Sequence, residues 1–167
     1  MDISFSYSHE DTPTGTRIIN AYNLLDPHFL LMYGDNYWEI ELEKMIAHFK
    51  LTKKSLMTTV YDNKMQDGEY GKENNIYVSD SGIVKRYDKS RKSRILNGVD
   101  IGFFIIDRNI LEIDESNFSF EELLLKKLAL EGKLSAFVTG KKYYYITNNE
   151  SLEKFRVFSK SLNNPFE

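Results

Sequence analysis

Two hydrophobic periods alternate along the first half of this chain, and that alternation limits its fold more than any other feature. Short apolar, β-branched or alternating runs are typical of strands, whereas apolar residues spaced three and four apart are typical of one helix face. The expected strands are Ile3–Tyr7, Phe29–Tyr33, Leu56–Tyr61 and Val99–Ile106. Helices are expected over Thr16–Leu25 and Ile40–Phe49. Strands that alternate with helices in this way predict an α/β fold.

The second half adds a hairpin and a closing set of elements. Ile76–Val78 and Ile83–Tyr87 flank a turn, Ser79-Asp80-Ser81-Gly82, which predicts two antiparallel strands. A helix is expected over Phe118–Gly132 and should end at its glycine. The remaining expected elements are strands Leu134–Val138 and Tyr143–Ile146 and a helix over Glu150–Phe158. We find no linker, repeat or low-complexity segment, so residues 1–167 are expected to form a single domain with a mixed sheet.

Composition excludes several classes of protein. The 167 residues include no cysteine, so disulfides, thiolate metal sites and a cysteine nucleophile are absent. A net charge of −3 gives no general attraction to nucleic acid, so no nucleic-acid partner is expected. No apolar run approaches the roughly 18 residues of a membrane span, and no basic, apolar signal peptide is visible. A cytoplasmic protein without a membrane partner is therefore expected.

The segment His28–Trp38 (HFLLMYGDNYW) contains the most suggestive polar residue. Its apolar run stops at Gly34-Asp35, where an open α/β sheet places ligand-binding groups beyond the carboxyl end of a strand. Taken alone, Asp35 is equally well explained as a turn residue. The basic run from Lys85 to Arg94 is likewise explained by a solvated face, and the three histidines lack metal-ligand spacing.

The order of these pieces resembles the sugar-1-phosphate nucleotidyltransferase family. The matching motifs are a Pro-x-Gly-Thr loop at Pro13–Thr16, the LLMYGD strand that ends at Asp35, and Arg86-Tyr87-Asp88-Lys89 in place of a Glu-Lys-Pro element. Val99–Phe103 is similar to the family's Asn/Asp-x-Gly strand, and residues 118–152 to its closing helix and Asp-Ile-Gly-Thr-Pro-Glu segment. Enzymes that activate mannose- or heptose-type sugars, the guanylyltransferases, are the most similar in character.

The resemblance implies a Rossmann-like nucleotide-diphospho-sugar transferase fold, here incomplete, and a defined reaction. An oxygen of a sugar 1-phosphate attacks the α-phosphorus of an NTP, and pyrophosphate leaves. Because both reactants are anions, such a site supplies Mg²⁺ and basic side chains. By the family pattern Asp35 holds Mg²⁺ and Lys89 pairs with the sugar phosphate, which makes both catalytic.

The same resemblance assigns binding residues. Gly15, Thr16 and Gly34 are expected to contact the nucleotide, because a glycine lets a base approach the backbone. Residues expected on the sugar side are Gly71, Asp88, Asp100, Gly102 and Glu121.

Two departures from the family pattern stand out. The loop of the form G-G-x-G-T-R that wraps the NTP phosphates is absent. It belongs to roughly the first 75 to 80 residues of the family pattern, which have no counterpart in this sequence. Tyr145 stands where a second metal carboxylate is expected, and a phenol is a poor Mg²⁺ ligand at neutral pH. Without the missing strands, Phe29–Tyr33 is expected to have an unpaired edge, so we expect a homo-oligomer or the missing N-terminal half as partner.

Two other functions are compatible with these residues. One is a non-catalytic relative that binds sugar or nucleotide through Asp35 and Lys89. The other is a glycosyltransferase, which is disfavoured because Asp35-Asn36-Tyr37 offers only the first carboxylate of an Asp-x-Asp motif. Release of pyrophosphate from an NTP and a sugar phosphate distinguishes the enzyme from the binding protein.

Overall fold

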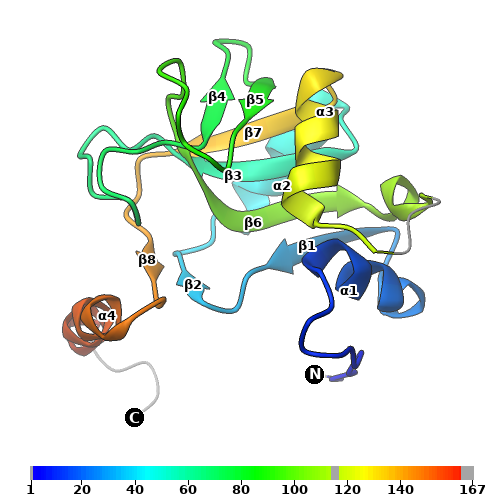
Figure 1. Ribbon diagram of the computed structural model, residues 1–167, viewed down its shortest axis with the longest axis horizontal. Helices are drawn as coiled ribbons and strands as arrows, with labels where there is room; N and C mark the ends of the chain where they lie inside the picture. The colour runs from blue at the N-terminus through cyan, green and yellow to red at the C-terminus, as the bar shows by residue number, and fades with distance from the viewer. Residues whose placement is uncertain (1, 114–116, 163–167) are drawn as a thin grey trace.

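A four-stranded sheet forms the centre of the computed structural model, which describes residues 2–113 and 117–162 (Figure 1). The strands lie in the order β1 (His28–Met32), β6 (Val99–Asp107), β3 (Leu56–Tyr61) and β7 (Leu134–Thr139). Strand β6 is antiparallel to both β1 and β3, whereas β3 and β7 are parallel. The mixed sheet expected from the sequence is therefore confirmed.

Helices cover both faces of this sheet. On β6, Phe104 and Ile106 point to one face and Phe103 and Ile105 to the other, because successive residues of a strand alternate. The first face packs against α1 (Thr14–Asn20) and against η3 (Phe120–Leu125), a π-helical segment that continues into α3 (Lys126–Leu130). The second face packs against α2 (Leu42–Thr52). After α3 the backbone of Gly132 has φ +65°, which confirms the expected glycine cap.

Smaller elements extend from the sheet. Strands β4 (Ile76–Val78) and β5 (Val84–Tyr87) form the expected hairpin. Strands β2 (Asn36–Tyr37) and β8 (Tyr144–Tyr145) pair with each other and carry the C-terminal helix α4 (Asn149–Ser161), which lies beside β8 and away from the main sheet (Figure 1). Short 3₁₀ turns, η1 (Tyr22–Leu24) and η2 (Arg108–Leu111), complete the described elements.

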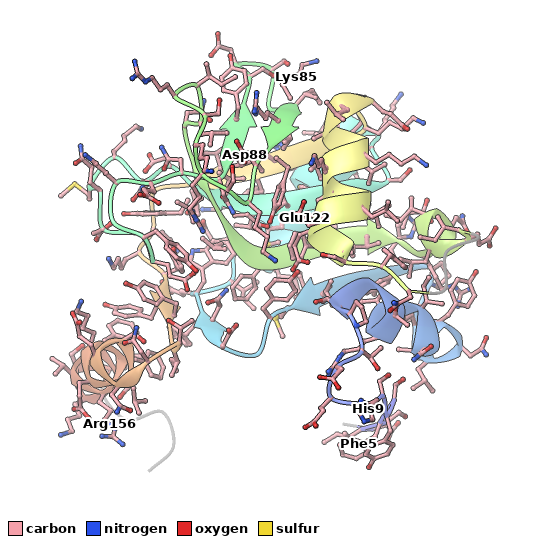
Figure 2. All side chains as sticks on the ribbon, in the orientation of Figure 1. Phe5, His9, Lys85, Asp88, Glu122 and Arg156 are labelled. Atoms are coloured by element: carbon pink, nitrogen blue, oxygen red, sulfur yellow. The ribbon has the colours of Figure 1, made fainter. Side chains whose placement is uncertain are left out.

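The prediction of a strand over Ile3–Tyr7 is wrong. This segment has no regular secondary structure, and its three large side chains, Ile3, Phe5 and Tyr7, are 65%, 70% and 86% exposed. Figure 2 shows Phe5 and His9 on an arm that extends from the body of the protein. The alternating pattern is correct for a strand, but a strand forms only where a neighbour accepts its hydrogen bonds.

Strand β1 is present but is less buried than its sequence predicts. It lies at one end of the sheet, and among residues 2–113 and 117–162 it pairs only with β6, so its other edge is unpaired there, as we expected. Its side chains are half-buried or exposed, and Met32 is 51% exposed. A strand that is apolar on both faces is here an edge strand rather than a central one. Among the described residues, no helix is both long and apolar enough to cross a membrane.

Candidate functional site

An open cleft lies at the end of β1. It has a volume of about 1020 Å³ and lies between α1, β1 and Glu121 of η3; we call it the β1 cleft. Gly34 and Asp35 line it where the chain leaves β1, and both are exposed. A Cβ added to Gly34 would meet no atom within 4 Å. The protein therefore leaves open space at the position where the sequence analysis expects a nucleotide and Mg²⁺.

A buried carboxylate forms one wall of the β1 cleft. Glu121 accepts hydrogen bonds from the Tyr33 hydroxyl and from Ser119 Oγ, the latter at 2.9 Å. Burial by itself raises the pKa of Glu121, but these hydrogen bonds and the positive charge of Lys89 lower it below its ordinary value overall. Burial and the bond to Glu121 raise the pKa of Tyr33. Glu121 is thus an ionised carboxylate within the electrostatic reach of Lys89.

A second carboxylate connects three strands. Asp100 Oδ1 accepts hydrogen bonds from Thr58 Oγ1 of β3 at 2.9 Å and from the Gly102 amide at 3.1 Å, and its Oδ2 accepts one from the Tyr87 hydroxyl of β5 at 3.2 Å. Burial raises the pKa of Asp100 to about 6 against the effect of these bonds. Asp100 keeps partial access to solvent although protein surrounds it on most sides. Its carboxylate thus ties the end of β5, which precedes Lys89, to the sheet.

Gly102 has a structural explanation of its own. Its φ is +76°, a conformation that favours glycine, and an added Cβ would lie 2.9 Å from Tyr33 Cδ2 and 3.0 Å from Asn36 Nδ2. The missing side chain lets Tyr33 cross β6 and reach Glu121. The structure therefore connects Gly102 with the site through Tyr33.

The two residues expected at the nucleotide base, Gly15 and Thr16, face a neighbouring segment of the protein. A Cβ on Gly15 would lie 2.3 Å from Phe118 Cε2, and Thr16 Oγ1 accepts a hydrogen bond from the Phe118 amide at 3.1 Å. This contact fastens α1 to the segment before η3. Other residues of the same loop and helix, among them Thr14 and Arg17, line the β1 cleft.

Of the five expected sugar-side residues, Glu121 alone lines the β1 cleft; Asp100 and Gly102 lie behind it as described above, and Gly71 and Asp88 lie elsewhere. Gly71 has φ +60° and lies in a turn, and its carbonyl oxygen accepts a hydrogen bond from Asn63 Nδ2 at 3.0 Å. Asp88 accepts hydrogen bonds from the amide and hydroxyl of Ser90 and forms an ion pair with Arg86 at 3.5 Å. Asp88 lines a separate groove between β5 and α3, as does Lys89. Contact of either Gly71 or Asp88 with a sugar stays a prediction.

The structure also identifies residues that the sequence analysis did not single out. The sequence places Tyr33 and Tyr87 at the ends of predicted strands, yet their hydroxyls donate hydrogen bonds to Glu121 and Asp100. Burial raises the pKa of Glu69, and the negative charge of Asp35 raises it further, so these carboxylates lie within electrostatic reach of each other. Tyr145, already noted in the sequence where a second metal carboxylate is expected, pairs with Asn36 in the β2–β8 ladder beside Asp35. No signal in the sequence marks Glu69, because it lies within the polar loop between β3 and β4.

Comparison with known proteins gives one curated relative and many similar folds. A probable glucose-1-phosphate cytidylyltransferase of Bacillus subtilis (strain 168) is 30% identical over 139 residues, which cover 81% of this chain and 51% of that protein. The chain thus spans about half the length of the curated relative that it matches. No protein-family model matches the chain.

Solved structures share the fold at lower identity. HddC from Yersinia pseudotuberculosis superimposes with a TM-score of 0.70 at 22% identity, covering 88% of this chain and 62% of HddC. A putative glucose-1-phosphate thymidylyltransferase from Bacillus anthracis gives a TM-score of 0.72 at 11% identity, covering 94% of this chain and 65% of that one. A curated relative and two similar folds agree with the motifs found in the sequence. The chain is therefore similar in sequence to a sugar-1-phosphate nucleotidyltransferase and shares the fold of the solved structures, and it spans about half to two thirds of the length of these proteins.

Proposed function

We propose that this chain takes part in nucleotidyl transfer from an NTP to a sugar 1-phosphate, which yields an NDP-sugar and pyrophosphate for cell-surface polysaccharide precursors. The observation that carries the proposal is the β1 cleft, where Asp35 and Glu121 face the same open space and Lys89 lies within electrostatic reach of Glu121. The names of the relatives add support: a cytidylyltransferase and a thymidylyltransferase are both named for glucose 1-phosphate, and HddC has been solved with GMP-PN. These names differ in base and sugar, so this proposal leaves both open.

In the proposed reaction the chain positions two anions. A phosphate oxygen of the sugar 1-phosphate attacks the α-phosphorus of the NTP, a new P–O bond forms, and the bond to pyrophosphate breaks. Lys89, whose ammonium group is exposed and has no ion-pair partner in the described parts of the chain, neutralises the sugar phosphate. Glu121 fixes Tyr33 across the cleft, and Asp100 fixes Tyr87, two residues before Lys89. Residues 1–167 act in this proposal as one partial, cytoplasmic domain.

The carboxylates around Asp35 fit a Mg²⁺ ion that takes most of its ligands from phosphate and water. Among the described residues, no group of three or more histidines, aspartates or glutamates could hold a metal ion. Mg²⁺ bound by one or two carboxylates, with phosphate and water oxygens as the other ligands, needs no such group. Asp35 would hold the ion, and Glu69 is the second carboxylate within electrostatic reach. When bound there, Mg²⁺ would neutralise charge on the α-phosphate.

A direct assay tests the proposal. Purified chain is mixed with Mg²⁺, a panel of CTP, GTP and TTP, and either glucose 1-phosphate or mannose 1-phosphate, and released pyrophosphate is measured. Asp35→Asn and Lys89→Gln should abolish or strongly reduce release, while Lys92→Gln, an exposed lysine of the same loop, should leave it unchanged. Binding of both substrates is measured in parallel by calorimetry.

The second candidate function, a non-catalytic binding protein, has one structural observation in its favour. The edge of β1 that is unpaired within the described part of the chain borders the cleft, so the cleft is open along this strand. Saturable binding of sugar 1-phosphate without any release of pyrophosphate would support this alternative. Absence of both binding and release would refute the proposed function itself.

A further inference from the structure

A second groove, distinct from the β1 cleft, carries a concentration of positive charge. It lies between the β4–β5 hairpin and the helical segment η3–α3 and has a volume of about 560 Å³, within the range of small-molecule sites. We call it the β5–α3 groove. In Figure 2 the labelled Lys85, Asp88 and Glu122 lie along the seam between the hairpin and the helix. Four cationic side chains line this groove: Lys85, Arg86, Lys89 and Lys126.

The acidic residues of the groove neutralise only part of this charge. Asp88 pairs with Arg86 at 3.5 Å, and Glu122 pairs with Lys126 at 3.9 Å, which is long for an ion pair. Neither Lys85 nor Lys89 forms an ion pair or a side-chain hydrogen bond with the described residues. The groove therefore keeps an excess of two positive charges in a chain whose net charge is −3. Exposed cations concentrated in a concave surface attract an anion.

Apolar surface lies next to these cations. The ring of Tyr77 is half-buried, and Ile95 and Leu130 are 55% and 76% exposed, all three lining the same groove. A free inorganic anion would leave this surface in water, whereas a ring or chain attached to a phosphate would cover it. The chemistry of the groove thus fits an organic phosphate better than a simple anion.

We propose that the β5–α3 groove is a second binding site, for a small organic phosphate whose anion pairs with Lys85, Lys89 and Lys126 and whose organic part covers Tyr77 and Ile95. Lys89 connects this site to the β1 cleft, because it lines the groove and its charge also acts on Glu121. Its flexible stem lets the ammonium group serve one anion at a time. An organic phosphate in the groove would thus withdraw Lys89 from a sugar phosphate, a consequence that rests on the proposed function.

The test uses phenyl phosphate and inorganic phosphate as probes, with backbone amide NMR of the full chain as the readout. Phenyl phosphate should shift the amides of β5 and α3 saturably and should bind at least about threefold more tightly than inorganic phosphate. The double variant Lys85→Gln/Lys126→Gln should weaken phenyl phosphate binding about 10- to 100-fold. The matched control Lys92→Gln/Lys127→Gln removes the same charge from exposed residues that do not line the groove, and should bind as wild type does.

Each outcome decides the proposal. Wild-type affinity in Lys85→Gln/Lys126→Gln, equal weakening in the control pair, or shifts that never saturate would overturn it. Equal affinity for the two probes would overturn the assignment of an organic ligand. Asp35→Asn separates this site from the proposed function, because it disables the β1 cleft and should leave the phenyl phosphate shifts unchanged. Saturable groove binding in a chain that neither binds sugar 1-phosphate nor releases pyrophosphate would refute only the proposed function.

Discussion

Replacement of Gly102 by alanine should destabilise the protein by about 2 to 4 kcal/mol. The left-handed φ of +76° costs a residue with a Cβ about 1 to 2 kcal/mol. The new Cβ would also lie 2.9 Å from Tyr33 Cδ2, and relief of such crowding in a packed site costs about 1 to 3 kcal/mol. The total stays below the sum of the two upper bounds, because a small shift of Tyr33 relieves part of the crowding although it leaves the cost of the backbone conformation unchanged. Urea unfolding monitored by tryptophan fluorescence and circular dichroism measures the difference.

Gly34→Ala provides the matched control for this prediction. A Cβ on Gly34 would have no atom within 4 Å, and the backbone there has no left-handed φ, so alanine should change the free energy of unfolding by less than about 0.5 kcal/mol. If a nucleotide occupies the open space, Gly34→Ala should instead weaken nucleotide binding. Equal urea midpoints for Gly102→Ala and wild type would refute the steric argument. A large loss of stability in Gly34→Ala would show that the space beside it is filled by protein.

Three further outcomes follow from single residues. Asp100, whose pKa is raised to about 6, binds a proton more tightly in the folded state than in the unfolded state. The free energy of unfolding should therefore fall by about 2 to 3 kcal/mol as the pH rises from about 4 to 6. Urea unfolding across that range should show this fall relative to Asp100→Asn, and parallel curves would contradict it. Asn148→Ala removes the capping box of α4 and should cost about 1 kcal/mol, seen as faster amide exchange in α4, whereas Asn149→Ala should not. Met32→Lys should reduce self-association through the unpaired edge of β1, measured by analytical sedimentation. The control Leu51→Lys, at a residue of α2 that is 79% exposed, should leave self-association unchanged. Equal effects of the two changes would exclude the β1 edge as the site of self-association.

The sequence alone predicts the elements that carry their own pattern. Leu56–Tyr61 forms β3 with the predicted bounds, because a β-branched run within a sheet centre needs no further information. The hairpin and the helix that ends before Gly132 are also found where turn and cap residues place them. Local chemistry fixes such elements, so their position is independent of what lies far away in the chain.

Elements that depend on a distant partner are predicted less well. Ile3–Tyr7 has the alternation of a strand, but no described strand pairs with it. Phe29–Tyr33 has the composition of a central strand but lies at an edge. The candidate site shows the same limit. Glu121 lies 88 positions from Tyr33, and Asp100 lies 42 from Thr58, so their hydrogen bonds are set by the fold and leave no local trace in the sequence.

Adjacent residues at the end of the hairpin and in the helical segment η3 point in opposite directions. Tyr87 turns inward to Asp100, whereas Asp88 turns outward to Ser90 and Arg86. Glu121 faces the β1 cleft, and the next residue, Glu122, faces the β5–α3 groove. Lys89 follows the hairpin, lines the β5–α3 groove and acts electrostatically on Glu121. Because Lys89 lines the groove and its charge acts on Glu121 of the β1 cleft, an anion in either place would act on the same lysine, which is the physical basis for the proposed coupling between the two sites.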